Sequence, residues 1–326
     1  MPPTTPSSSA SPERDYVFNI VWTGDVFTSL RPFVASLVAQ SAARFRFVVN
    51  YCTPSSIEAM TAYAELNPDR IIEVLDVTDD RMVGHGLALH RALEVRDDGE
   101  YFCFVDADIA ASKPFVSDFS EILRNYDVLS SGAEVWTDDN VVPENHLGVG
   151  IGGRHFYHPN GFVYGCPHLA MYRRAPLLDT MQRWDVHLGT RGDEISDRTA
   201  ARLDDVGHRY MAYDTAKVVN VLMQFDGYTL CHREHDSLTH IGGMSHYLAP
   251  PGNDQRSGEV GEPKWTTFDG MESRASVARF TASMLSELLA GNPAPEVPEG
   301  IGDDLDHRLR RVRTTLVDLI GRYGDG

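Results

Sequence analysis

The stretch Tyr101-Phe102-Cys103-Phe104-Val105-Asp106-Ala107-Asp108-Ile109 decides the fold class of this chain. Its first five residues form an unbroken apolar run, which is typical of a strand buried on both faces of a parallel sheet. Side chains two positions apart point to the same side of an extended chain, so we expect Asp106 and Asp108 to project together from the carboxyl end of this strand. Open α/β sheets bind their ligands at that end.

The two carboxylates predict a cation site. Two carboxylates held close together repel each other unless a cation lies between them. Oxygen ligands suit Mg²⁺ and Mn²⁺, and such an ion takes one or two carboxylates and completes its coordination with phosphate oxygens. An Asp-X-Asp pair also occurs by chance as an acidic turn, and that alternative stays open here.

The segment Phe104-Val105-Asp106-Ala107-Asp108-Ile109 resembles the Asp-X-Asp motif of the GT-A-fold glycosyltransferases, which use nucleotide sugars as donors. In that family the pair holds a divalent metal on the donor diphosphate. The resemblance therefore implies that Asp106 and Asp108 bind Mn²⁺ or Mg²⁺. It also implies a third protein ligand near the end of the domain, for which His240 is the candidate and His246 the alternative.

Strands and helices alternate before this motif. The pattern predicts strands at 16–22, 45–51 and 70–76, and helices at 30–39, 55–67 and 86–95. Such alternation indicates an α/β fold with a mainly parallel, Rossmann-like sheet flanked by helices. Residues 15–115 resemble the nucleotide-binding half of a family-two-like GT-A enzyme, in which a Gly-X-X-X-Ala-X-X-X-Ala-Leu segment precedes the Asp-X-Asp strand. Here that segment runs from Gly84 to Leu93.

The resemblance also implies a domain organisation. Residues 15–250 form the GT-A domain, with a nucleotide-binding half at 15–130 and an acceptor half at 131–250. Residues 1–14 are rich in Pro, Ser and Thr, so we expect a disordered tail rather than a signal peptide. Residues 251–326 are expected to form a helical appendage, whose amphipathic helices at 271–290 and 305–323 serve packing or a homodimer contact.

Several residues at the ends of predicted elements are candidates to bind the donor by the same resemblance. Thr23, Asp25 and Asn50 follow the first two strands, and each is equally expected as a turn or capping residue. Glycines near the start of the third helix would let that helix come close to the donor. The candidate donor-contacting residues are Thr23, Asp25, Asn50, His85, Gly86, Asp106 and Gly242.

An inverting transferase needs a carboxylate that takes a proton from the acceptor hydroxyl. In the related families this base stands at a helix start in the second half of the domain. Asp214, Asp193 and Glu194 are the candidates here, and we prefer Asp214 because its Tyr-Asp-Thr setting resembles the family pattern. Asp214 is equally expected as the N-cap of a helix at 218–225, and the other two as favourable charges at a helix start.

Composition and missing motifs limit the other function classes. The chain has 326 residues and a formal net charge of -18, which argues against nucleic acid or an anionic membrane as the main partner. No apolar stretch approaches the roughly 20 residues of a transmembrane helix. The four cysteines include no Cys-X-X-Cys pair, which argues against a zinc site and for a reducing, cytoplasmic location. The dinucleotide-binding fingerprint and the P-loop motif are both absent.

The sequence therefore predicts a metal-dependent glycosyltransferase that moves a hexosyl group from a nucleotide-diphosphate sugar to a hydroxyl of a small-molecule, glycan or lipid-linked acceptor. A Gly- and His-rich run at 134–165 is predicted to be a mobile acceptor or lid loop. Two alternatives remain. One is a pyrophosphorylase or phosphohydrolase of nucleotide sugars, and the other is a catalytically silent nucleotide-sugar-binding module.

Overall fold

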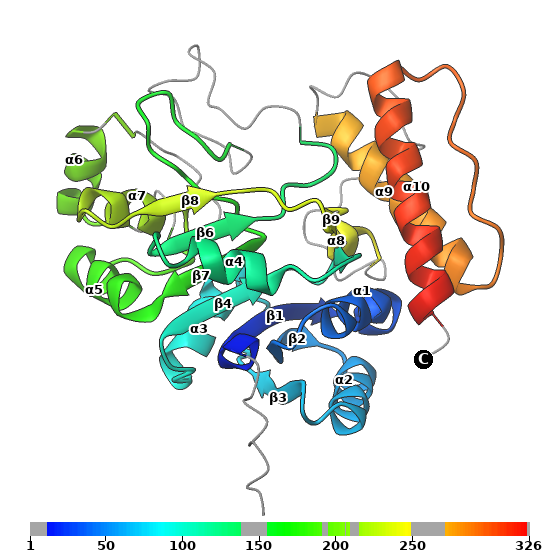
Figure 1. The fold of residues 1–326 in the computed structure, drawn as a ribbon, viewed down its shortest axis with the longest axis horizontal. Helices are drawn as coiled ribbons and strands as arrows, with labels where there is room; N and C mark the ends of the chain where they lie inside the picture. The colour runs from blue at the N-terminus through cyan, green and yellow to red at the C-terminus, as the bar shows by residue number, and fades with distance from the viewer. Residues whose placement is uncertain are drawn as a thin grey trace, which may run out of the picture.

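The computed structural model describes residues 12–137, 155–190, 195–205, 207–208, 215–248 and 271–324. These residues build one seven-stranded sheet covered by helices, with a separate two-stranded ribbon (Figure 1). The strands are β1 (Val17–Gly24), β2 (Arg44–Cys52), β3 (Ile71–Asp76), β4 (Tyr101–Val105), β5 (Ile109–Ala111), β6 (Val128–Ser131), β7 (Leu169–Arg173), β8 (Leu230–His232) and β9 (Leu238–His240).

The large sheet has the strand order β3-β2-β1-β4-β7-β6-β8. Strand β7 runs antiparallel to both of its neighbours, whereas the other pairs in this sheet are parallel. The expected α/β class with a mainly parallel sheet is therefore confirmed, and β7 is its antiparallel exception. The short strands β5 and β9 pair antiparallel with each other, outside the large sheet.

The central position of β4 follows from its sequence. Alternate side chains of β4 enter two different apolar clusters, one on each face of the sheet. Cys103 and Val105 pack with α1 (Phe27–Ala39) and α4 (Val116–Ile122). Phe102 and Phe104 pack on the other face, beneath α3 (His85–Val95), α5 (Arg174–Trp184), α6 (Asp197–Asp205) and α7 (Lys217–Phe225). An apolar run without polar breaks is what a strand needs when both of its faces are buried.

A short turn precedes β1. Pro12–Asp15 form this 3₁₀ turn, η1. The Glu13 carboxylate accepts a hydrogen bond of 2.6 Å from the Ala42 N–H, which fixes this turn next to β2. Helix α2 (Pro54–Leu66) follows β2, and its N-cap is Thr53, whose side chain accepts a hydrogen bond from the Ser56 N–H.

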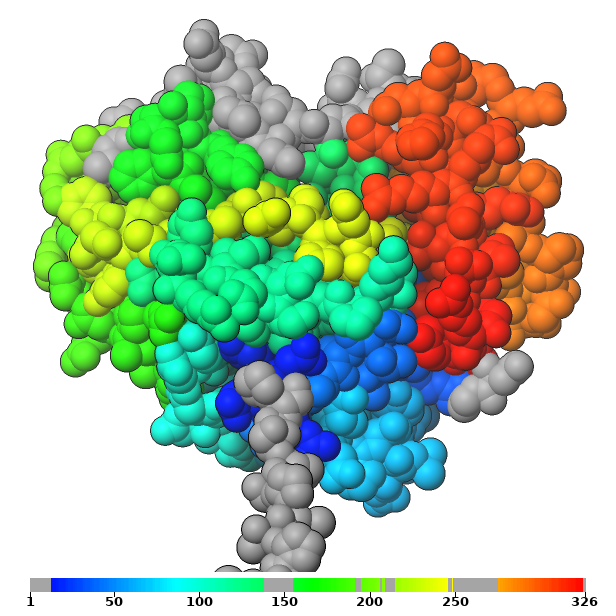
Figure 2. All heavy atoms as spheres, viewed as in Figure 1, coloured from blue at the N-terminus to red at the C-terminus, as the bar shows by residue number. Residues whose placement is uncertain are grey.

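The C-terminal helices belong to the main core. Helices α9 (Met271–Leu289) and α10 (Asp303–Tyr323) pack on each other and on α1, and α9 also packs on the short helix α8 (Met244–Tyr247). Figure 2 shows this orange-to-red segment directly against the rest of the molecule. Val312, Leu316 and Leu319 of α10 are buried in the same apolar cluster as the residues of α1. The apolar stripe that suggested a homodimer contact is therefore covered within one chain.

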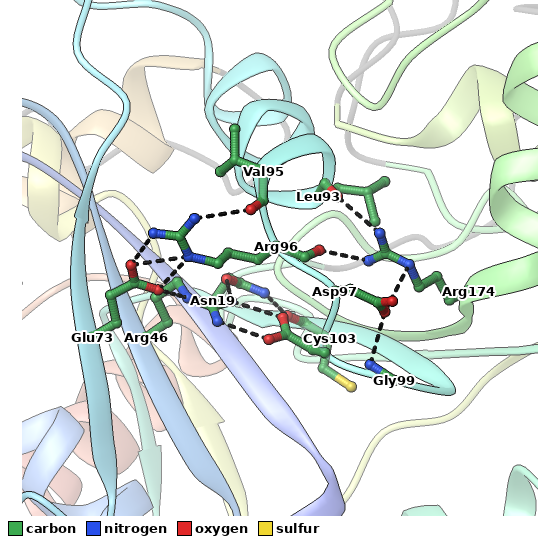
Figure 3. Close-up of polar contacts among 11 residues, drawn as sticks. Asn19, Arg46, Glu73, Leu93, Val95, Arg96, Asp97, Gly99, Cys103 and Arg174 are labelled. Carbon is green, nitrogen blue, oxygen red and sulfur yellow. Dashed lines mark hydrogen bonds and ion pairs between the residues drawn. The ribbon is translucent and has the colours of Figure 1, made fainter.

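A network of ion pairs closes the amino ends of the strands (Figure 3). The Arg46 guanidinium donates two hydrogen bonds of 2.7 Å to the Asp98 carboxylate. It also donates to Glu73 at 2.8 Å, and Arg96 pairs with the same Glu73 carboxylate. This network ties β2 and β3 to the segment between α3 and β4. In the described part of the chain, no helix combines the length and apolar character that crossing a membrane requires.

Candidate functional site

Asp106 and Asp108 lie where β4 ends, as the sequence predicts, but the strand geometry differs from the expectation. The strand ends at Val105, and the next residues form a turn that leads into β5. Alternation along an extended chain therefore does not bring the two carboxylates together. Instead, the β5–β9 pairing sets Ile109 opposite His240, which places the His240 ring beside both aspartates.

The His240 ring is oriented by a hydrogen bond at its far nitrogen. Nδ1 lies 2.7 Å from the Gly132 carbonyl oxygen, which can only accept, so Nδ1 carries the proton. Nε2 then faces the carboxylates, at 3.1 Å from Asp108 Oδ1 and 3.8 Å from Asp106 Oδ2. The second Asp108 oxygen accepts a hydrogen bond of 3.0 Å from the Met244 N–H. The predicted metal-binding residues Asp106, Asp108 and His240 are thus brought together.

His168, which the sequence analysis did not single out, joins the same group. Its Nδ1 lies 2.9 Å from Asp106 Oδ2, and its Nε2 lies 2.8 Å from Glu134 Oε1. One potential ligand atom each from Asp106, His168 and His240 lies within 4.8 Å of the other two. His168 directly precedes β7, and its carbonyl accepts a hydrogen bond of 2.7 Å from the Asp106 N–H. Only the antiparallel course of β7 brings its first residues to the end of β4.

The charges in this cluster shift one another. Burial lowers the pKa of His168, but the carboxylates of Glu134 and Asp106 outweigh burial and hold that pKa well above its usual value. Burial raises the pKa of Asp108, but the charge and hydrogen bond of His240 and the Met244 N–H outweigh it, so the pKa is lowered. Burial likewise opposes ionisation of Glu134, whose pKa is nevertheless lowered by His168. The site therefore favours negative carboxylates that face a positive partner.

One carboxylate oxygen in the cluster is not satisfied. Asp106 Oδ1 is buried and makes no hydrogen bond to any residue in the described ranges. His85 Nε2, from the first residue of α3, lies 3.4 Å from this oxygen. The other nitrogen of His85 lies 3.1 Å from Thr215 Oγ1. A buried oxygen without a hydrogen-bond donor is one that a cation can satisfy, so this position fits a metal.

Gly86 and Gly242, which the sequence predicts to contact the donor, lie close against other parts of the protein. A Cβ on Gly86 would lie 2.4 Å from the Leu188 carbonyl oxygen, so the glycine permits contact between α3 and the loop after α5. Gly242 has a φ of +83°, and a Cβ there would meet Glu134 Cγ at 2.6 Å. The close approach that both glycines permit is therefore to protein, because their neighbours are backbone and side-chain atoms of this chain.

The candidates on the first two strands occupy the carboxyl edge in different ways. Asn50 is buried, and both ends of its side-chain amide bond the backbone of Val83, which fixes the segment that leads into α3. Asp25 is exposed and accepts a hydrogen bond of 3.1 Å from Thr53 Oγ1. Thr23 is half-buried near the end of β1. The next residue after Asn50, Tyr51, combines 49% exposure with a φ of +66°.

The three candidate bases Asp214, Asp193 and Glu194 lie outside the described residues, as does the side chain of His246 and the loop segment 138–154. Helix α7 begins at Lys217, and its N-cap is Ala216, which has a left-handed conformation.

Comparison with known proteins finds similarity to solved structures at low sequence identity, among them TarS, LgtC and WbbM. No protein-family model and no curated protein matches the chain. A crystal structure of S. aureus TarS 1-349 is 16% identical, with a TM-score of 0.43, over 71% of this chain and 62% of that one. The galactosyltransferase LgtC, in complex with donor and acceptor sugar analogues, is 12% identical, with a TM-score of 0.43, over 86% of this chain and 98% of that one.

The third structure is the bifunctional glycosyltransferase WbbM, at 9% identity and a TM-score of 0.38, over 71% of this chain and 40% of that one. TarS 1-349 also has a structure in complex with UDP-GlcNAc. This chain thus spans less than two thirds of the TarS structure that it matches. Similarity at this level does not show which reaction this chain catalyses.

Proposed function

We propose that this chain is a metal-dependent glycosyltransferase that moves a sugar from a nucleotide-diphosphate sugar to a hydroxyl acceptor. The observation that carries the proposal is the convergence of Asp106, Asp108 and His240 at the carboxyl end of the central strand. Asp106 Oδ1 adds a buried carboxylate oxygen without a hydrogen bond among the described residues. Such a cluster suits a divalent cation at the place where open α/β sheets bind ligands.

Asp106, Asp108 and His240 would hold Mn²⁺ or Mg²⁺ against the donor diphosphate. When bound, that ion neutralises negative charge on the leaving nucleotide as the glycosidic bond breaks. Asp108 is placed to fix the ring of His240 and is itself anchored by the Met244 N–H. The hydrogen bonds of Asp108 and His240 hold both side chains in place, as a preorganised site requires.

The nucleoside would lie along the carboxyl ends of β1 and β2. Thr23 is the last residue but one of β1 and Asp25 directly follows that strand, and His85 faces Asp106 from the start of α3. Tyr51 has an exposed ring at the same edge. Any nucleobase can stack on an aromatic ring of this kind. Its positive φ is uncommon for a residue other than glycine, and such strain concentrates at ligand sites.

Proton transfer from the acceptor needs a carboxylate, for which Asp214, Asp193 and Glu194 remain the candidates. The acceptor would be a small molecule, a glycan or a lipid-linked sugar. The net charge of -18 argues against nucleic acid as that acceptor.

The test is a calorimetric titration of nucleotide-diphosphate sugars, UDP-GlcNAc among them, with and without Mn²⁺. We expect one donor to bind only with metal in the wild type, and to lose binding in Asp108→Ala. His235→Gln is a matched control, because its ring pairs with Asp118 rather than with the cluster. A donor affinity that is the same with and without metal, and the same in the wild type and Asp108→Ala, would contradict the proposal and favour a silent binding module. Release of free nucleotide at the same rate with and without acceptor would favour the phosphohydrolase.

A further inference from the structure

His168 and Glu134 form a pair that the Asp-X-Asp motif does not account for. Glu134 lies just after β6, and His168 just before β7, so the pair joins two neighbouring strands at the edge where Asp106 lies. The His168 side chain is 16% exposed and that of Glu134 is 12% exposed. A surface salt bridge would leave both groups in water, whereas this pair lies within the cluster.

The two imidazole rings of the cluster, His240 and His168, are oriented in the same way. His240 turns its Nδ1 to the Gly132 carbonyl oxygen, and His168 turns its Nε2 to Glu134 Oε1. In each ring the opposite nitrogen then faces Asp106 Oδ2, at 3.8 Å for His240 and 2.9 Å for His168. Histidines that bind metals almost always donate their far N–H to a carboxylate or carbonyl, which fixes the tautomer and the ring orientation.

The Glu134 carboxylate is itself held in place. Its second oxygen accepts a hydrogen bond of 2.8 Å from Thr137 Oγ1. Gly242 leaves room for its Cγ, which a Cβ at that position would approach to 2.6 Å. From α10, Arg308 donates to the carbonyl oxygens of Val135 and Thr137, at 3.0 and 3.2 Å. The segment that carries Glu134 is thereby fixed from both sides, as an orienting group requires.

We propose that His168, oriented by Glu134, is a further metal ligand, and that the site therefore takes a divalent transition ion in preference to Mg²⁺ or Ca²⁺. The inference rests on the metal dependence of the proposed function and deepens it. Imidazole nitrogen suits ions such as Fe²⁺, Ni²⁺ and Zn²⁺, whereas Mg²⁺, Ca²⁺ and, to a smaller degree, Mn²⁺ prefer oxygen ligands. A set with two imidazoles thus selects against the two alkaline-earth ions.

The experiment measures metal binding to the full-length protein after chelation, without donor. Mn²⁺, Co²⁺ and Mg²⁺ are titrated separately into the wild type, His168→Gln, Glu134→Gln, Asp106→Asn and the control His235→Gln. We expect Co²⁺ to bind the wild type at least about 10-fold more tightly than Mg²⁺, with Mn²⁺ between the two. His168→Gln and Glu134→Gln should weaken Co²⁺ binding by about 10- to 100-fold, with the control unchanged.

Two spectra test the ligand directly, and the second of them needs no variant. The visible absorption of bound Co²⁺ should change in Glu134→Gln, which keeps the shape of the side chain. Pulsed electron paramagnetic resonance of the Cu²⁺-loaded wild type should detect two imidazoles. One imidazole only, or wild-type Co²⁺ affinity and spectrum in both His168→Gln and Glu134→Gln, would overturn the inference.

The outcomes also separate the inference from the proposed function. If Asp106→Asn abolishes metal binding while His168→Gln leaves it unchanged, His168 is not a ligand and the proposed function survives. If no ion binds the wild type, both the inference and the proposed function fail.

Discussion

Strand β4 has a cluster of buried charge at each end, and the two clusters differ in how their charges are matched. At the amino end, Arg46 is 3% exposed and meets two carboxylates, Asp98 and Glu73. A second guanidinium, Arg96, pairs with Glu73 (Figure 3). Two cations thus face two anions, and Asn19 accepts a further hydrogen bond from Arg46 at 3.0 Å. This cluster is complete within the protein.

The cluster at the carboxyl end is not balanced in this way. Within the described part of the chain, the ion pairs of Asp106, Asp108 and Glu134 are with histidines only. A histidine supplies positive charge only when protonated, and one Asp106 oxygen has no hydrogen bond there. A buried cluster whose charges are paired within the protein makes the fold sensitive to the loss of any one partner, whereas a cluster with an unsatisfied carboxylate oxygen can bind a cation.

The largest expected effect is on stability at the amino end. Asp98→Ala leaves the Arg46 guanidinium buried without its bidentate partner, so we expect a loss of about 3–5 kcal/mol in the free energy of unfolding. Asp97→Ala is the matched control, because the neighbouring Asp97 side chain is 81% exposed and its ion pair contributes about 1 kcal/mol or less. Urea unfolding measures both. Equal losses in the two variants would contradict the distinction between the clusters.

The second effect is metal-induced stabilisation at the carboxyl end. An ion that binds only the folded protein, at a free concentration 100 times its dissociation constant, adds about 2.7 kcal/mol to the free energy of unfolding. We expect this increment with Mn²⁺ in the wild type and its loss in Asp106→Asn. Asp98→Ala should keep the increment on a lower baseline, because its site is at the other end of β4. Urea unfolding at matched Mn²⁺ concentrations decides this, and an unchanged increment in Asp106→Asn would count against the metal site.

The third prediction tests whether Gly86 is needed for packing within the protein or for contact with the donor. Gly86→Ala would place a Cβ 2.4 Å from the Leu188 carbonyl oxygen, so we expect a loss of about 1–3 kcal/mol. Gly321→Ala is the control, because nothing lies within 4 Å of that Cβ and alanine favours the helix by roughly 0.5–1 kcal/mol. Thermal and urea unfolding report the loss. Normal stability with weakened donor binding would restore the donor-contact role instead.

The sequence predicted most of the fold because its decisive signals are local. The apolar run before Asp106 identifies a doubly buried strand, and alternating strands and helices identify the parallel sheet. His168 could not be found in that way, since its place depends on the antiparallel pairing of β7 with β4. The role of His240 was expected from resemblance, but its contact with Asp108, 132 positions away in the chain, depends on the β5–β9 register that pairs Ile109 with His240.

The smallest expected effect concerns the pH dependence of the amino-end cluster. The hydrogen bond from Arg96, followed by the contacts with Arg46, outweighs burial and lowers the pKa of Glu73 below its ordinary 4.5. The unfolded chain therefore takes up a proton at a higher pH than the folded one, so this stabilisation is complete above 4.5 and is lost as the pH falls through the folded-state pKa. Because Glu73 is 25% exposed, we expect Glu73→Gln to cost about 1 kcal/mol at neutral pH. Urea unfolding of both proteins between pH 7 and pH 3.5 should show the difference shrinking as acid is added, with Glu58→Gln, on the exposed side of α2, as the control. A difference that stays constant over this range would mean that Glu73 acts through packing, and that its charge is not part of the balance that distinguishes the amino end from the carboxyl end.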